Sequence, residues 1–447
     1  MTDNQLNLIS EIQNFRERHP HIQEVDLIAL DIPGNFFGKR YAISQLEKLV
    51  KEGFKLPAAM HLMCAQGFPV EALGHGADDG DPDASFELVA GSLQVVSWLT
   101  TPCAQMLITC SGELPVMWEP RRVLANLLDT LNEAGIFPVV AFEPEFYLLD
   151  KKRTAQDLIQ PPINGHSGRR DNSAVLNMER IGGFAECLRD ITQTCGEQGI
   201  KTGPISAELG AGQFEINLDH HNDVLLAADQ CALYRRAIKG VAHKHNYQAT
   251  FMAKPYLDQA GNGMHLHVSF YDAQGNNLLA KDQQKPLLNA VAGCLALMPQ
   301  SMLFFASNRN AFRRLEPGKA TTVSPCWGYE NRSVAVRIPQ SDEKNLRLEH
   351  RVASADANPY LTLAAILAGM YHGLKNKLEP GPATDFDVTK ASGLPQDIIT
   401  AIAHTQQAKE LTNYLGGDFI KIYCAQKYSE LKAFENEIAA REYDWYL

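Results

Sequence analysis

Apolar and polar residues alternate clearly along FPVVAFEPEFYLLD, residues 137–150. β-favouring residues dominate this stretch and Gly135 ends the helical pattern before it, so the pattern predicts a β-strand. Residues two apart on a strand share a face, so Glu143 and Glu145 project together while Phe142 and Phe146 point the other way. A divalent cation would neutralise the two carboxylates, because hard cations prefer oxygen ligands. The alternative is a half-exposed strand with two solvated glutamates.

Four later stretches repeat this alternation of a polar and an apolar face. The predicted strands are 212–218, 263–270, 332–339 and 346–352. The residues on their polar faces that interest us are Gln213, Glu215, Asn217, His265, His267, Ser269, Arg337, Arg347, Glu349 and Arg351, with Glu208 just before the first strand. Carboxylates with an imidazole suit Mg²⁺ or Mn²⁺, and arginines bind phosphate or carboxylate bidentately. Together they predict a phosphoryl-transfer site.

The sequence of a P-loop is missing from the chain. Both Gly34 to Arg40 and Gly318 to Ala320 fail the G-x-x-x-x-G-K-[ST] pattern. A nucleotide would therefore have to bind to a curved sheet rather than to a loop–helix turn.

The rest of the pattern predicts an α+β protein. Helical periodicity runs over 4–19, 119–134, 182–198 and 222–245, and over most of the chain after 355. Strands interleave with these helices without strict alternation, which favours a largely antiparallel sheet backed by helices. At 447 residues the chain exceeds one ordinary core. We predict an N-terminal domain over 1–112 with a leading helix, and a larger domain over 113–447.

Composition and charge limit the classes of partner that we expect for this protein. The 41 basic and 52 acidic residues give a net charge of −11, which disfavours nucleic-acid binding. The N-terminus lacks the apolar core of a signal peptide, and no run of about 18 apolar residues predicts a membrane span. The nine cysteines form no C-x-x-C pair, so we expect reduced thiols and a cytoplasmic protein with no membrane partner.

Several motifs, in order, resemble the glutamine synthetase family over nearly the whole chain. They are FEPEF (142–146), E-x6-E (208–215), KPY with GNGMHLHVS (254–269), RRLEPG (313–318), NRSVAVRIP (331–339), RLEHR (347–351) and ADANPYL (355–361). The resemblance implies an N-terminal β-grasp domain and a catalytic domain with a curved antiparallel sheet. It also implies a homo-oligomer, a dodecamer of two hexameric rings, in which the DGDPD stretch (79–83) completes a neighbour's active site.

The resemblance also implies a role for each matching residue. Two to three Mg²⁺ or Mn²⁺ ions are expected per site, one bound by Glu145, Glu208 and Glu215 and a second by Glu143, His265 and Glu349. Glutamate is expected at Gly261, His265, Arg314 and Arg351, and the co-substrate ATP at His267, Ser269, Arg337 and Arg347. Arg332 is expected to steady the transferring phosphoryl group, so that Arg332 and Arg314 are the candidate catalytic residues.

Departures from the family pattern point to the substrate. Ammonia-using members carry a flap glutamate where this chain has Ala320, and no carboxylate follows until Glu330. Ala260 replaces an asparagine near the glutamate position, and 381–390 lack the tyrosine that is adenylylated in some bacterial members. Stretches such as FFGKR (36–40) and ATFMAKPY (249–256) are similar to the polyamine-ligating branch of the family.

The resemblance therefore predicts an ATP-dependent ligase that joins the γ-carboxylate of glutamate to a primary amine, with putrescine as the expected amine. The intermediate would be γ-glutamyl phosphate. Two alternatives are a glutamine synthetase that uses ammonia, and a catalytically inactive member with a structural or regulatory role. The group that deprotonates the amine is not identified by any motif.

Overall fold

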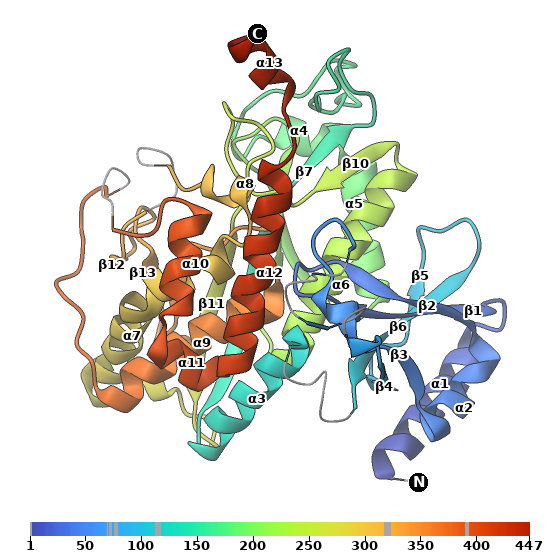
Figure 1. The fold of residues 1–447 in the computed structure, drawn as a ribbon, viewed down its shortest axis with the longest axis horizontal. Helices are drawn as coiled ribbons and strands as arrows, with labels where there is room; N and C mark the ends of the chain where they lie inside the picture. Colours follow the sequence, from blue (N-terminus) through green and yellow to red (C-terminus); the bar gives the residue numbers. More distant parts are fainter. Residues whose placement is uncertain are drawn as a thin grey trace.

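Two β-sheets organise the computed structural model, which describes residues 2–68, 70, 74–75, 79–111, 118–316, 323–388 and 393–447. A smaller sheet and two helices form the N-terminal part, and a larger sheet with most of the helices forms the rest (Figure 1). The predicted α+β fold, with an N-terminal β-grasp-like sheet and a curved sheet backed by helices, is confirmed. The predicted domain boundary between 112 and 113 falls within 112–117, which lies outside the described residues.

The N-terminal sheet has the strand order β2-β1-β6-β4-β3, with β5 paired to β6. Its strands are β1 Glu24–Leu30, β2 Phe36–Ala42, β3 Phe54–Pro57, β4 Asp83–Leu88, β5 Gln94–Val96 and β6 Cys103–Cys110. The central pair β1–β6 is parallel and the other pairs are antiparallel. Helix α1 (Asp3–Arg18) buries Leu8, Ile12 and Phe15, whose spacing places them on one helix face, and helix α2 (Leu46–Glu52) joins the same core.

The larger sheet, which we call the catalytic sheet because the family resemblance places the expected active site on it, has the order β12-β13-β14-β11-β7-β9-β8, with β10 paired to β7. Its strands are β7 Phe137–Asp150, β8 Thr202–Ala207, β9 Gln213–Leu218, β10 Tyr247–Thr250, β11 Met264–Tyr271, β12 Trp327–Tyr329, β13 Val336–Ile338 and β14 Leu348–His350. All pairs are antiparallel except β12–β13. The strands predicted over 332–339 and 346–352 are shorter than expected, with three residues each.

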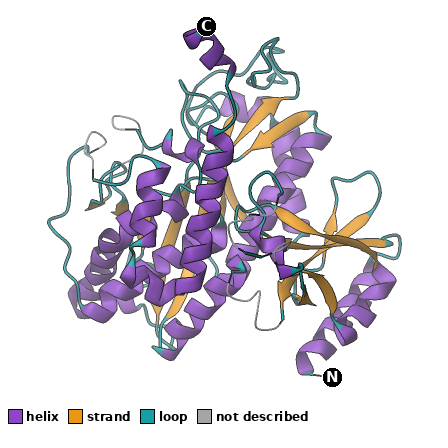
Figure 2. Ribbon diagram, in the orientation of Figure 1, coloured by secondary structure: helices purple, strands orange, loops and turns teal. Residues whose placement is uncertain are grey.

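Helices cover this sheet from one side (Figure 2). They are α3 Pro120–Glu133, α4 Met178–Gly183, α5 Ala185–Glu197, α6 Val224–Lys244, α7 Lys281–Phe305, α8 Arg309–Phe312, α9 Pro359–Asn376, α10 Ile398–Gln406, α11 Lys409–Leu415 and α12 Gly417–Glu435, whereas the last helix, α13 Ala440–Tyr446, buries no residue. The apolar face of β7 enters one large core with them, through residues such as Phe142 and Phe146. Burying that face leaves the opposite, polar face of the sheet for chemistry.

One described helical stretch, Leu278–Phe305, is long and apolar enough to cross a membrane. However, 67% of its most apolar window is buried inside the protein. The stretch packs against α9 and α10, which is the environment of a core helix.

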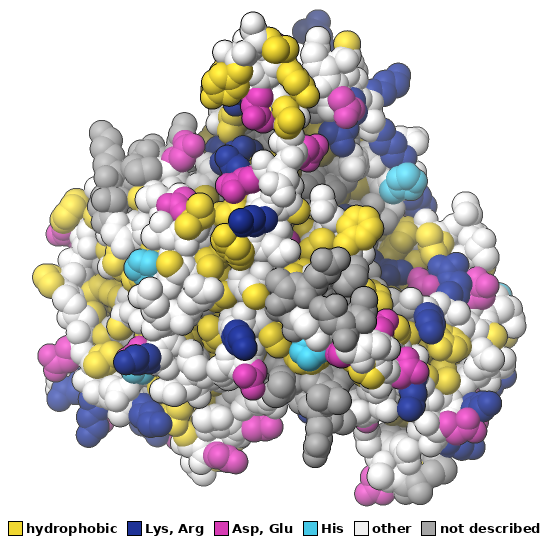
Figure 3. Space-filling view, viewed as in Figure 1, with side chains coloured by type: hydrophobic (Ala, Val, Ile, Leu, Met, Phe, Trp, Pro, Cys, Tyr) yellow, Lys and Arg dark blue, Asp and Glu magenta, His cyan; other side chains and the backbone are white. Residues whose placement is uncertain are grey.

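Helix α13 extends away from the body at the C-terminus (Figure 1). Apolar side chains gather on it at the top of the molecule (Figure 3), where Tyr443, Trp445, Tyr446 and Leu447 are all exposed.

Candidate active site

A pocket of about 870 Å³ lies over the polar face of the catalytic sheet. The residues predicted from sequence that line it are Glu143, Glu145, Glu208, Glu215, Gly261, His265, His267, Arg314, Arg332, Arg337, Arg347, Glu349 and Arg351. Ser269 is not among the lining residues. It shares a strand face with His265 and His267, but it lies further along β11, opposite Val139, and is buried.

Strand register brings acidic and imidazole side chains together on the four neighbouring strands β14, β11, β7 and β9. Glu145 on β7 lies opposite Glu215 on β9, and Glu143 on β7 lies opposite His265 on β11. Glu349 on β14 lies opposite the next polar residue of β11, His267. Because paired residues on adjacent strands share a face, four strands direct their carboxylates and imidazoles to one place.

The side chains meet at distances that suit cation binding. His265 Nδ1 lies 3.9 Å from Glu143 Oε2 and 3.8 Å from Glu349 Oε1, and His267 Nε2 lies 3.1 Å from Glu143 Oε1. Two groups have ligand atoms within 4.8 Å of one another, Glu143–Glu215–His265 and Glu143–His267–Glu349. Carboxylate oxygens with one imidazole are a donor set that fits Mg²⁺ or Mn²⁺.

Burial and the repulsion between neighbouring glutamates destabilise the ionised form of these carboxylates. Burial and the nearby Glu145 and Glu143 raise the pKa of Glu215 to about 9. Burial, with Glu208 adding to it, raises the pKa of Glu145 to about 7. Like charges held together out of water favour the neutral form, so bound cations would relieve an unfavourable arrangement.

The other end of the pocket is rich in arginine. Burial would raise the pKa of Glu349, but the positive surroundings of His265, Arg351 and Arg337 lower it to about 2. Arg337 Nη1 donates to Glu349 Oε2 at 2.7 Å, and Arg351 donates to the other carboxylate oxygen. Arg347 Nε lies 3.1 Å from His267 Nδ1. Guanidinium groups arranged in this way suit phosphate.

Arg314 forms a third part of the site. It is buried and donates from Nη1 to the carbonyl of Val352 at 2.8 Å. Burial lowers its pKa to about 10. A Cβ atom added to Gly261 would lie 2.8 Å from Arg314 Cγ, and one added to Gly263 would lie 2.6 Å from Nη2. The two glycines therefore leave the room that this guanidinium occupies.

Several polar partners complete the site. Asn217 Nδ2 donates to Glu143 Oε1 at 3.0 Å, and the backbone N–H of Gly263 donates to Glu145 Oε2 at 2.7 Å. Glu330 also lines the pocket, where it pairs with Arg337 at 3.3 Å. The flap position Ala320 lies outside the described residues.

A second group of metal-ligand side chains lies apart from this pocket. His61, Cys110 and Glu119 have ligand atoms within 4.8 Å of one another and are all buried. Glu119 accepts from Thr109 Oγ1 at 2.7 Å and from the N–H of Cys110 at 3.0 Å. The Glu119 carboxylate is therefore satisfied by its own neighbours. We call this group the N-terminal cluster.

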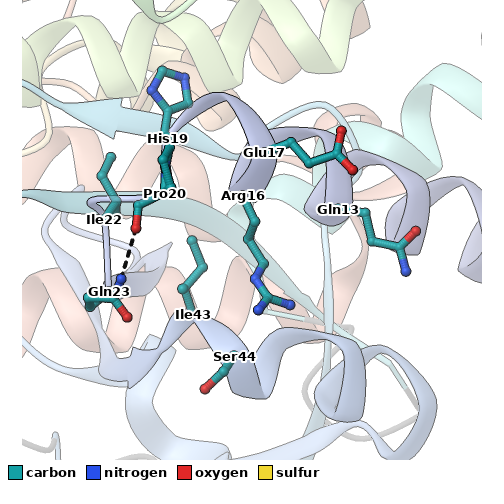
Figure 4. A pocket seen from close by; sticks show the side chains of 9 residues that line it. All are labelled: Gln13, Arg16, Glu17, His19, Pro20, Ile22, Gln23, Ile43 and Ser44. Carbon is teal, nitrogen blue, oxygen red and sulfur yellow. Dashed lines mark hydrogen bonds between the residues drawn. The ribbon is translucent and has the colours of Figure 1, made fainter.

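A second hollow, of about 370 Å³, lies beside α1 (Figure 4). Arg16 and Glu17 from the helix and Ser44 from the following segment line it, and Gln23 Nε2 donates across it to the carbonyl of Pro20 at 3.0 Å. Glu17 and His19 line this hollow, but none of the metal-ligand groups found among the described residues lies in it, so the pocket over the catalytic sheet is the candidate active site.

Comparison with known proteins agrees with this geometry. The glutamine synthetase catalytic-domain family model matches residues 117–446. The chain belongs to the glutamine synthetase family. This confirms the family predicted from the sequence motifs.

The relatives include amine ligases. The chain is 41% identical to the gamma-glutamylputrescine synthetase PuuA of Escherichia coli (strain K12), over 98% of this chain and 94% of that protein. It is 27% identical to a glutamate–isopropylamine ligase of a Pseudomonas species, over 97% and 96% of the two chains. A solved GmaS/ADP complex shares the fold with a TM-score of 0.83 at 22% identity, covering 97% of this chain and 99% of that one.

Proposed function

We propose that this protein is an ATP-dependent glutamate–amine ligase whose amine is an alkylamine, with putrescine as the expected substrate. The observation that carries the proposal is one pocket that combines an acidic candidate cation site with several arginines. Two similar proteins, named as a gamma-glutamylputrescine synthetase and a glutamate–isopropylamine ligase, support the choice of an amine as the acceptor.

The proposed reaction has two steps. A γ-carboxylate oxygen of glutamate attacks the γ-phosphorus of ATP, the bond to ADP breaks, and γ-glutamyl phosphate forms. The amine nitrogen then attacks the acyl carbon, phosphate leaves, and the nitrogen loses a proton. Both steps develop negative charge on phosphoryl or carbonyl oxygens, which positive groups must offset.

We assign the pocket residues to these steps. Glu145, Glu208 and Glu215, and Glu143, His265 and Glu349, would hold the divalent ions, which supply charge neutralisation on the phosphoryl oxygens. Arg314 and Arg351, with His265 and Gly261, would hold the carboxylates of glutamate. Arg337, Arg347 and His267 would contact ATP, and Arg332, which lines the same pocket, would contact the phosphoryl group in transfer. We make no such assignment for the buried Ser269.

Ammonia remains the competing acceptor, because similar proteins from Pyrococcus and Halobacterium species are named glutamine synthetases. The deciding experiment measures phosphate release with Mg-ATP and glutamate across ammonium, putrescine, cadaverine, spermidine and ethanolamine. Preference for putrescine with ammonium nearly inert supports the proposal. Ammonium as the best acceptor contradicts it, and no release with any amine points to an inactive family member.

We further propose a cytoplasmic homo-oligomer, a dodecamer of two hexameric rings whose neighbours share active sites. The exposed apolar residues of α13 and the exposed residues 79–83 support contacts between copies, and the nine free cysteines suit a reducing compartment. We also retain domains over 1–112 and 113–447. Light scattering of the purified protein tests the assembly, and a mass near that of a monomer, 49.5 kDa, contradicts it.

A further inference from the structure

Two strongly exposed leucine side chains stand out among the mostly charged and polar residues of the pocket. Leu176 is 69% exposed and Leu209 is 52% exposed, and both line the pocket. Leu209 directly follows Glu208, and the N–H of Leu176 donates to the carbonyl of Ala207 at 2.8 Å. The two leucines therefore lie on either side of the Glu208 backbone, at the acidic part of the pocket.

A buried arginine holds the two leucine-bearing loops together. Arg180 is 3% exposed. It donates to the carbonyl of Ala174 at 2.8 Å in the first loop, and to the carbonyls of Glu208 and Gly210, which flank Leu209, in the second. Its charge is balanced by Asp171 at 2.9 Å. Side chains on a platform fixed in this way are preorganised for binding.

The backbone at Leu176 is held in an unfavourable conformation. Its φ is +54°, a left-handed conformation that costs a non-glycine residue about 1 kcal/mol or more. Such strain persists only where surrounding contacts impose it, and it concentrates at ligand-binding sites. Here the hydrogen bonds of Leu176 and Arg180 impose it, and the result is a leucine directed to the pocket.

We propose that Leu176 and Leu209 form the binding site for the alkyl chain of the amine, beside Glu208. This inference rests on the proposed function and adds which residues select the amine. The acidic part of the pocket attracts the ammonium group while the aliphatic surface next to it contacts the methylenes, so the two together recognise an alkylammonium ion. Ammonium has no methylenes and gains nothing from the leucines, whereas each methylene that leaves water contributes favourably.

The test uses Leu176→Asn, Leu209→Asn and the double variant, assayed with ammonium, methylamine, ethylamine, propylamine and butylamine. Asparagine has nearly the size of leucine and tolerates positive φ, so the Leu176 variant should fold at least as well as the wild type. The matched control is Leu257→Asn, because Leu257 is 66% exposed but does not line the pocket.

We expect wild-type kcat/KM to rise about two- to fourfold per methylene, since full burial of a CH₂ corresponds to a factor of about four. The variants should flatten this rise by raising KM for the longer amines, with kcat and the KM for glutamate and ATP little changed. Leu257→Asn should retain the wild-type slope.

Three results overturn the inference while the proposed function stands. They are an unchanged slope in both variants, an equal loss with all amines including methylamine, and a loss of assembly in light scattering that accounts for the loss of activity. A wild-type protein that releases no phosphate with any amine instead overturns the proposed function. The two failures are therefore distinguishable in one set of assays.

Discussion

The active-site group and the N-terminal cluster each bring histidine and carboxylate side chains together, but with opposite electrostatic outcomes. In the N-terminal cluster, burial lowers the pKa of His61 to about 3 and raises the pKa of both Cys110 and Glu119. At neutral pH these shifts favour an uncharged histidine and an uncharged thiol. The cluster is enclosed, with the His61 ring stacked on Phe86 at 5.8 Å between centroids.

In the active-site group, five glutamates and two histidines line a pocket instead: Glu143, Glu145, Glu208, Glu215, Glu349, His265 and His267. Arginines at one end keep Glu349 ionised, while Glu145 and Glu215 are crowded by like charges. The difference shows that burial alone neutralises a polar group, whereas access to a pocket lets the same side chains be satisfied by a ligand.

The largest expected effect is loss of activity in Glu215→Gln. Removing a candidate cation ligand should reduce kcat/KM by at least about 100-fold. Loss of a residue that only orients a metal ligand typically costs about 10–100-fold, and loss of the ligand itself should cost more. The metal-free variant should unfold at a higher temperature than the wild type, because one crowded carboxylate is gone. Steady-state kinetics and calorimetry measure the two effects.

The matched change in the N-terminal cluster is Glu119→Gln, and the contrast predicts the reverse behaviour. Activity should stay within about tenfold, while stability falls by about 1–3 kcal/mol because the amide cannot accept from both Thr109 and Cys110. Full activity in Glu215→Gln, or increased stability in Glu119→Gln, would contradict the comparison.

A second prediction concerns Arg337→Gln at the arginine-rich end. The substitution removes a charged hydrogen bond to Glu349 and a candidate ATP contact, so KM for ATP should rise about tenfold or more, as loss of one charge-assisted bond implies. KM for glutamate should change less. Arg40→Gln, which removes an exposed ion pair with Asp26 on the N-terminal sheet, is the control, and an equal effect in that variant would sink the assignment.

A third prediction concerns pH and metal removal. The raised pKa values of Glu145 (about 7) and Glu215 (about 9) mean that the folded state keeps protons which the unfolded state releases near pH 4.5. This contribution to stability is present at low pH and is lost as pH rises through about 9. In EDTA, the melting temperature should therefore fall between pH 6 and pH 9.

Mn²⁺ should reverse that fall, because cations bind the ionised carboxylates. At 100 times its dissociation constant a ligand adds about 2.7 kcal/mol, so the gain in melting temperature should be larger at pH 8.5 than at pH 6. Glu215→Gln serves as the comparison, with a smaller gain. A gain independent of pH in the wild type would argue against these carboxylates as the ligands.

The smallest expected effect is on acid stability in His61→Phe. Because the pKa of His61 is lowered to about 3, the unfolded state binds a proton below pH 6.5 that the folded state refuses. Stability is thus lost as pH falls from 6.5 towards 3. His61 Nε2 has no hydrogen-bond partner among the described residues, so phenylalanine between Phe37 and Phe86 should cost about 1 kcal/mol or less at pH 7.

Denaturant unfolding at pH 7 and pH 4.5 measures this effect. The variant should show a smaller loss between the two values than the wild type. Buried His350, whose pKa is also lowered to about 3, remains in both proteins, so only the His61 share should disappear. An unchanged pH dependence would contradict this view of the N-terminal cluster.

The sequence predicted the family, the fold class and nearly all of the pocket's charged residues. Strand alternation was sufficient for Glu143, Glu145 and His265, because a period of two fixes which side chains share a face. Alternation does not show how far along a strand the pocket extends. Ser269 lies on the predicted face, but it does not line the pocket. The predicted roles of these residues are still to be tested.

Strand alternation could not identify functional residues that lie in loops or that hold loops in place. Leu176 and Leu209 sit outside any periodic pattern, and Arg180 lies far along the chain from two of the three carbonyls that it binds. Their importance arises from tertiary contacts, which a single sequence does not encode as a local signal. The short strands β13 and β14 were overestimated for a similar reason, since their flanking residues bend into the site.

The position of Arg180 has a practical consequence for enzyme engineering. Arg180 binds backbone carbonyls in the two loops that carry Leu176 and Leu209. Substituting those two side chains therefore leaves the hydrogen bonds of Arg180 unchanged. Residues 176 and 209 can therefore be changed while Arg180 keeps the backbone of both loops in place. Libraries randomised at these two positions should yield ligases with new acceptor ranges at little cost in folding, whereas randomising position 180 should yield mostly unfolded or inactive protein.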